Sequence, residues 1–137
     1  MSHPFTMTRT VDKPFIKTVI ATRAALADQG FGIISEIDLA TTLRDRLGIE
    51  SPPQVILGAC RPELAHRAIS LNPSIATMLP CNVVVRQVGE NVCVVEAFDP
   101  DEMARISDDE GLKDIATDAR DRLVAALDAQ TQRNQED

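Results

Sequence analysis

The chain has 137 residues, a hydrophobic fraction of 44% and a formal net charge of −7. This length and apolar content suit one domain with a buried core. No apolar run approaches the ~18 residues of a membrane-spanning helix. The first residues also lack the basic and apolar regions of a signal peptide. We therefore expect a soluble, cytoplasmic protein without a membrane partner.

The negative charge is confined to the last third of the chain. Residues 1–98 carry nine basic and nine acidic side chains, whereas residues 99–137 carry five basic and twelve acidic ones. Phosphate binding requires the opposite sign, and with aromatic residues at 3% there is little to stack on bases. We expect no nucleic-acid partner. The acidic segment is interpreted as a solvated helix face, with a docking surface for a basic partner as the alternative.

Three widely spaced cysteines, Cys60, Cys81 and Cys93, do not form a disulfide framework, because their number is odd and no secretion signal accompanies them. No Cys-x-x-Cys pair is present, and His3 and His66 lie far apart in the sequence. The local ligand pairs of a structural zinc site are therefore missing, and no metal site is predicted.

The first half of the chain alternates strands and helices. Strands are predicted over residues 5–11, 31–37 and 54–59, and a helix over residues 13–29 that Asp12 caps and Gly30 ends. A second helix starts at Ser35 or Asp38 and ends at Gly48; a third starts at Pro62 and ends before Pro73. The apolar positions expected to face the core in these three helices are Phe15, Ile16, Val19, Ile20, Ala24 and Ala27; Leu39, Leu43 and Leu47; and Leu64, Ala65, Ala68 and Leu71.

The second half predicts a hairpin and a long helix. β-Branched runs at residues 81–86 and 91–96 flank a Gly-containing turn, and alternation places Cys81, Val83 and Val85 on the core face. Ser107 and Glu110 have the spacing of a capping box for a helix of about 20 residues. The apolar face of that helix is Leu112, Ile115, Ala119, Leu123 and Leu127. We expect one globular domain over residues 1–129 and a disordered polar tail over residues 130–137.

The element order is therefore β-α-β-α-β-α-β-β-α. Strands with one polar face fit a sheet covered by helices on a single side. We expect an α+β two-layer sandwich with one mostly antiparallel sheet. A doubly wound parallel sheet is the alternative, and the hairpin argues against it.

Four segments carry a resemblance to a known family. They are Gln-Gly-Phe-Gly at residues 29–32 leading to Glu-Ile-Asp at 36–38, Leu-Gly-Ala-Cys-Arg-Pro at 57–62, Leu-Pro-Cys before a valine strand at 79–85, and Phe-Asp-Pro at 98–100. In this order the chain resembles the bacterial and archaeal domain of unknown function numbered three hundred and two. The resemblance implies a compact two-layer sandwich that pairs as a homodimer, and it implies no established reaction. The family often has Asn where this chain has Arg61, so an amide role at that position does not carry over.

Cys60 and Cys81 are the candidate site. Cys60 precedes a helix that starts with proline, where the helix dipole and Arg61 favour a thiolate. Cys81 follows Leu-Pro at the start of a strand, and both thiols are equally compatible with buried packing. His66 falls on the polar face of its helix, with an exposed role weighed against a thiol–base couple or a soft-metal or haem pocket with Cys60. The acidic residues of 99–110 lack the order of a calcium loop and are interpreted as helix caps and linker.

Two hypotheses of different classes follow. The first is a non-enzymatic, homodimeric binding or accessory module for an unidentified small molecule. The second is a thiol-dependent protein, handling redox equivalents, sulfur or a soft ligand through Cys60 and Cys81. No catalytic motif such as a P-loop or nucleophile elbow is present, so the sequence favours the first hypothesis, and the cofactor is unknown.

Overall fold

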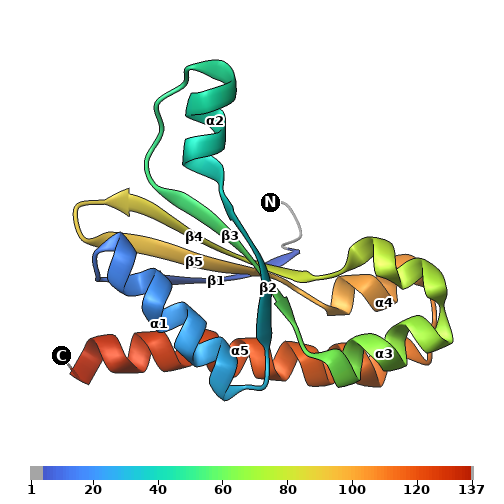
Figure 1. Ribbon diagram of the computed structural model, residues 1–137. Coiled ribbons are helices and arrows are strands. Elements are labelled where there is room, and N and C mark those ends of the chain that lie inside the picture. Colours follow the sequence, from blue (N-terminus) through green and yellow to red (C-terminus); the bar gives the residue numbers. More distant parts are fainter. Residues whose placement is uncertain (1–4, 137) are drawn as a thin grey trace.

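The computed structural model of the chain describes residues 5–136 and is built on one antiparallel sheet (Figure 1). Its strands lie in the order β1-β5-β4-β3-β2, with every neighbouring pair antiparallel. The strands are β1 (Thr6–Val11), β2 (Gly32–Asp38), β3 (Gln54–Cys60), β4 (Cys81–Gly89) and β5 (Val92–Phe98). The expected α+β sandwich is therefore confirmed, and the parallel alternative is wrong.

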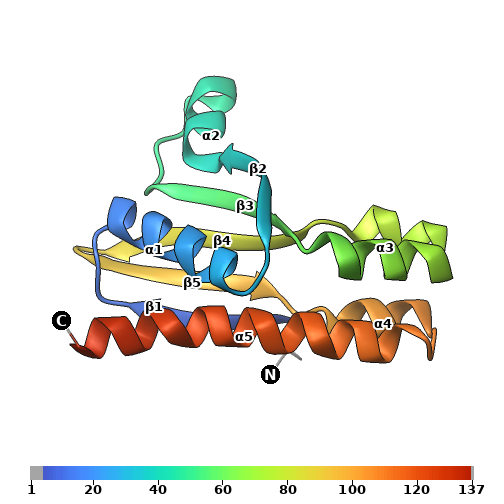
Figure 2. The same ribbon diagram turned by 60° about the horizontal axis from the view of Figure 1, so that its bottom comes forward.

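The helices divide between the two sides of the sheet and one of its ends. α1 (Phe15–Asp28) and α5 (Leu112–Glu136) cover one face, whereas α2 (Leu39–Leu47) stands on the opposite side (Figures 1 and 2). α3 (Pro62–Leu71), the 3₁₀ helix η1 (Pro73–Met78) and α4 (Asp101–Ser107) extend beyond the strand ends, beside the first turns of α5. No helix of the described residues is long and apolar enough to cross a membrane.

The helix-covered face of the sheet forms the main core. Cys81, Val83 and Val85 of β4 are buried there, as the strand alternation predicts, together with Val95 of β5 and Leu57 of β3. A second buried cluster lies past the strand ends, where α3, η1 and α4 pack on α5. The two clusters meet near the end of β3 and the start of β4, which is where the candidate cysteines lie.

The predicted core face of α1 is wrong in part. Ile16 and Ile20 are 66% and 62% exposed, while Thr18 and Thr22 are buried. Each threonine hydroxyl donates to the carbonyl four residues earlier, Thr18 to Pro14 at 2.9 Å and Thr22 to Thr18 at 2.7 Å. These bonds satisfy the hydroxyls inside the helix, so burial costs little and apolarity alone does not identify the inner face. Asp12 is not the cap either; α1 has Pro14 at that position.

α2 forms where the sequence predicts but does not pack as predicted. Asp38 caps the helix by accepting from the backbone N–H of Thr41 at 3.0 Å, and Gly48 ends it with a φ of 70°. None of its residues is buried, and Leu47 is 65% exposed. The expectation that its leucines face the core is therefore wrong, because the helix leaves the sheet layer. In α3, Leu64 and Ala68 are buried, but Leu71 is exposed.

The capping box at Ser107 is also wrong. Ser107 is the last residue of α4, a helix that the sequence did not predict, and its hydroxyl donates to the Met103 carbonyl at 2.7 Å. Asp108 ends α4 in the left-handed conformation, with a φ of 54°. α5 then begins at Leu112. All five apolar positions predicted for the inner face of α5 are buried: Leu112, Ile115, Ala119, Leu123 and Leu127.

The predicted polar tail begins inside the folded part of the chain. α5 continues to Glu136, and Gln130 is only 2% exposed. The side-chain oxygen of Gln130 lies 3.1 Å from the Thr22 hydroxyl, which shares its one proton between this oxygen and the Thr18 carbonyl, and the contact joins the end of α5 to α1. Gln130 therefore belongs to the core. The side chains of residues 132–136, residue 137 and His3 lie outside the described residues.

The two faces of α1 provide a stability test. We expect Leu26→Ala to lower the free energy of unfolding by about 2–5 kcal/mol, because it empties a fully buried site. Ile20→Ala is the matched control on the same helix and should change it by less than about 0.5 kcal/mol. Urea unfolding followed by circular dichroism measures both. A larger loss for Ile20→Ala than for Leu26→Ala would contradict the assigned face.

Candidate functional site: a cavity lined by two thiols

Cys60 lies at the junction of a strand and a helix. It is the last residue of β3; Arg61 follows as the N-cap of α3, and Pro62 occupies the first turn. The Arg61 carbonyl accepts hydrogen bonds from the backbone N–H groups of Leu64 and Ala65, both at 3.0 Å. The proline supports this turn because the N–H it lacks would have no partner inside the helix. The Cys60 side chain is half-buried there.

Cys81 lies beside Cys60 on the neighbouring strand. It is the first residue of β4 and follows a cis peptide bond between Leu79 and Pro80. In the β3–β4 register its partner is Ala59, the residue that precedes Cys60. Two cysteines that lie 21 positions apart in the sequence are thereby brought to the same end of two adjacent strands.

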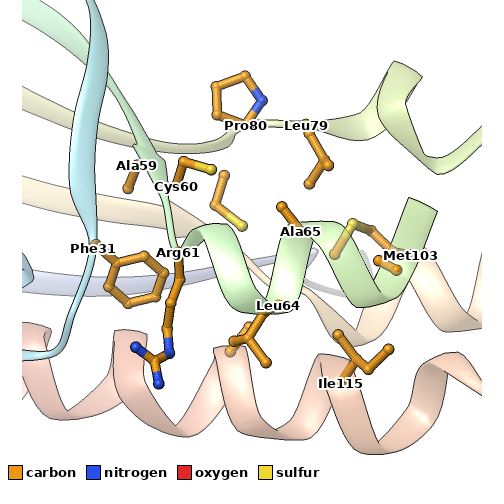
Figure 3. A pocket seen from close by; sticks show the side chains of 13 residues that line it. Phe31, Ala59, Cys60, Arg61, Leu64, Ala65, Leu79, Pro80, Met103 and Ile115 are labelled. Atoms are coloured by element: carbon orange, nitrogen blue, oxygen red, sulfur yellow. The ribbon is translucent and has the colours of Figure 1, made fainter. Parts of the chain in front are cut away.

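Both cysteines line one small apolar cavity between the two buried clusters (Figure 3). Its volume is about 30 Å³, enough for a water-sized or single-atom ligand. Phe31 stands at one side and Met103 at the other, and the Cys60 sulfur points into the space between Pro80 and Ala65. Arg61 is the only charged residue among those lining the cavity, within the described part of the chain.

The environment of Cys81 keeps its thiol protonated. Burial raises its pKa from 9.0 to about 11, and the nearby Cys60 adds to the increase because two thiolates repel each other. The effect of Cys60 shows that the two thiols lie within electrostatic reach of each other. A thiol that stays neutral at physiological pH is a poor nucleophile, so Cys81 does not fit the role of an activated cysteine.

Arg61 is held in place by packing and by one partly exposed ion pair. Its Nη1 lies 3.6 Å from Glu63 Oε2, and its Nε is buried with no hydrogen-bond partner. The guanidinium also passes directly over Gly30, where any Cβ would collide with Nη1. Gly30, predicted only as the end of α1, therefore has a second role besides its φ of 86°.

His66 is not part of the site. It is exposed on α3 and does not line the cavity, so the structure brings together Cys60, Arg61 and Cys81 but not the fourth candidate. No three His, Cys, Asp or Glu side chains gather into a metal-binding group within the described residues. In the acidic segment, Asp99 and Asp109 accept backbone N–H groups of Asp101 and Gly111, as the interpretation of helix caps and linker expects.

Gly58, which lies beside the site without lining the cavity, is a residue whose role the sequence analysis missed. A Cβ at this position would collide with the Ser35 hydroxyl and lie 2.8 Å from Pro80 Cγ. Position 58 of β3 must therefore carry no side chain if the Leu-Pro-Cys turn is to pack against this strand. Phe31 and Met103 were also missed as cavity residues, because their proximity to the thiols depends on contacts between distant segments. A glycine inside an otherwise β-branched strand is the one signal that could have pointed here.

Comparison with known proteins identifies the family. The model of a domain of unknown function, DUF302, matches residues 7–130. The chain belongs to the DUF302 family. A crystal structure of an uncharacterised conserved DUF302 protein from Bacillus stearothermophilus has 30% sequence identity and a TM-score of 0.85 over 92% of this chain and 98% of that one. No curated protein matches the chain. The family resemblance is confirmed, and so is the DUF302 fold.

The raised pKa of Cys81 predicts the pH dependence of its alkylation. In the native DUF302 protein, iodoacetamide should modify Cys81 slowly near pH 8 and faster only as the pH approaches about 11, because the thiolate is the reactive form. In urea the same residue should react as an ordinary thiol. Since the unfolded thiol loses its proton at lower pH than the folded one, rising pH above 9.0 also favours unfolding.

Peptide mass mapping after short pulses measures the alkylation rate of each cysteine separately. Circular dichroism at each pH verifies that the protein is still folded. Native Cys81 reacting at pH 8 as fast as it does in urea would contradict the assigned environment.

Proposed function

We propose that this DUF302 domain is a non-enzymatic binding module whose small ligand occupies the cavity lined by Cys60 and Cys81. The observation that carries the proposal is that two cysteines from separate strands line a single small apolar space. Apolar walls with a few polar or sulfur groups are typical of ligand sites. The remaining space is small, so the ligand group that enters it must be small as well.

The composition of the cavity wall favours binding over catalysis. Among the described residues, no His, Asp or Glu side chain lines the cavity, so the cavity wall offers none of these side chains as a general acid or base. The raised pKa of Cys81 argues against a nucleophile as well. Turnover of any metabolite by the protein, lost in Cys81→Ala, would contradict this proposal.

Filling the cavity tests the proposed binding site. Ala65 lines the cavity, and Ala65→Val adds two methyl groups to a space of about 30 Å³. We expect this variant to slow labelling of Cys60 by methyl methanethiosulfonate several-fold, because the added methyl groups crowd the space between Pro80 and Ala65 into which the Cys60 sulfur points. Ala24→Val, at an exposed position of α1, is the matched control and should leave the rate unchanged. Rates are measured by mass spectrometry, and equal labelling in both variants would count against the cavity as a binding site.

A thiol-dependent role is the second candidate, and the same juxtaposition of Cys60 and Cys81 favours it. Thiol–disulfide chemistry requires two sulfurs close to each other, and the shared cavity of Cys60 and Cys81 supports this role. The alkylation experiment above distinguishes the candidates. A thiol that reacts well below the ordinary pKa of about 8.5 supports this role, whereas two thiols that stay inert until unfolding end it.

We also propose that the domain pairs as a homodimer through the side of the sheet on which α2 stands. Ile37, Ile56 and Val84 lie in register on three neighbouring strands of that side. Ile37 is 47% exposed, and Ile34, Leu47 and Ile49 nearby are exposed as well. Exposed apolar side chains of this kind are what a partner subunit covers in a stable interface. β2 is also an edge strand with free backbone groups.

Light scattering after size exclusion tests the homodimer. We expect the wild-type protein to be a dimer and Ile37→Asp to be a monomer, because a charge at the centre of the apolar row opposes its burial. Ile106→Asp, at an exposed site on α4, is the control and should remain a dimer. A wild-type monomer at all concentrations would refute the pairing.

A cytoplasmic location is part of the same proposal. None of the three cysteines is in a disulfide, and Cys60 and Cys81 line the same cavity. Adjacent free thiols are the normal state in a reducing compartment.

A further inference from the structure

We propose that the ligand of the cavity is a single soft monovalent metal ion of the Cu(I) type, held between the sulfur atoms of Cys60 and Cys81. This inference rests on the proposed function, since it names the ligand class of the same cavity. The ion would bridge the end of β3 and the start of β4, where Cys60 and Cys81 both line the cavity.

The donor set selects the metal. Thiolate and thioether sulfur favour soft ions, whereas Ca²⁺ and Mg²⁺ require oxygen ligands that this apolar wall does not offer. Structural zinc and iron–sulfur clusters take four ligands, and no group of even three His, Cys, Asp or Glu side chains gathers among the described residues. Cu(I) is stably coordinated by two sulfur ligands. The thioether of Met103 lines the same cavity and provides a soft sulfur atom on the side opposite Phe31.

The size of the cavity points to an ion rather than an organic cofactor. About 30 Å³ accommodates one atom or a water molecule, so the haem considered from the sequence does not fit. The surrounding side chains, among them Phe31, Leu64 and Ile115, give the site apolar walls. An ion that binds sulfur and avoids hydration is stabilised by such walls.

Charge is balanced without a further ligand. As Cu(I) binds, each thiol releases its proton to solvent, and two thiolates with one monovalent ion leave a single negative charge. Arg61, the charged residue on the cavity wall, has its guanidinium directed toward α5 and away from the sulfurs, so its positive charge offsets the negative one only from a distance. Its Nε is buried without a hydrogen-bond partner, so the arginine has capacity left for an anionic neighbour.

The test is an anaerobic titration of the reduced full-length protein with Cu(I), in competition with the chelator bathocuproine disulfonate. We expect one Cu(I) per chain, confirmed by native mass spectrometry. Cys60→Ala and Cys81→Ala should each lower the affinity by at least ~100-fold, since losing a ligand costs more than the 10–100-fold of an outer-shell change. Cys93→Ala is the matched control, because Cys93 is buried in the sheet away from the cavity, and it should bind as the wild type does.

A second measurement needs no substitution, in case a variant fails to fold. One equivalent of Ag(I), which has the same soft character, should protect Cys60 of the wild-type protein from methyl methanethiosulfonate. Binding that survives loss of Cys60 or Cys81, or no binding against the chelator, would overturn the metal proposal. The Ala65→Val labelling result would be unaffected in that case, so failure of the metal ion and failure of the cavity as a binding site are distinguishable.

Discussion

The pairing register of β3 and β4 is the constraint on which the site depends. It places Ala59 opposite Cys81, and so brings Cys60 next to Cys81 at the strand ends. A slip by one residue would turn Val83 and Val85 out of the core, and Cys81 out of the cavity with them. The register is fixed by burial on the helix-covered face, where both valines are almost completely enclosed. The same apolar packing that stabilises the sheet therefore positions the sulfurs.

Strand elements were predictable because their pattern is local. Alternation in residues 81–85 identifies the buried face of β4 from five side chains alone. The helices show the limit of that reasoning. Thr18 and Thr22 are buried where Ile16 and Ile20 were expected, because hydrogen bonds within α1 satisfy the threonine hydroxyls. A hydropathy pattern does not contain information about these hydrogen bonds. α2 has sound capping signals, but whether a helix packs on the sheet or leaves it is decided by tertiary contacts.

The candidate site was predictable in its thiols but not in its walls. Cys60, Arg61 and Cys81 were identified from their positions next to prolines, and the structure gathers them at one cavity. His66 was considered because it is close in sequence, and the turn of α3 places it outside the cavity. Phe31 and Met103 come from segments far from both cysteines. The β2–β3 pairing, which sets Gly32 opposite Cys60, brings Phe31 to the cavity, and the packing of α4 beyond the strand ends brings Met103 there.

The cavity persists because small side chains keep it open. Ala59, Ala65, Ala68 and Ala119 all line it, at positions where a larger aliphatic residue would close the space. Leaving about 30 Å³ unfilled costs only ~0.7 kcal/mol at about 24 cal/mol per Å³. A ligand of even modest affinity more than offsets that cost by mass action once it is present well above its dissociation constant. The empty and occupied forms can therefore share one fold, and binding needs no rearrangement of the sheet.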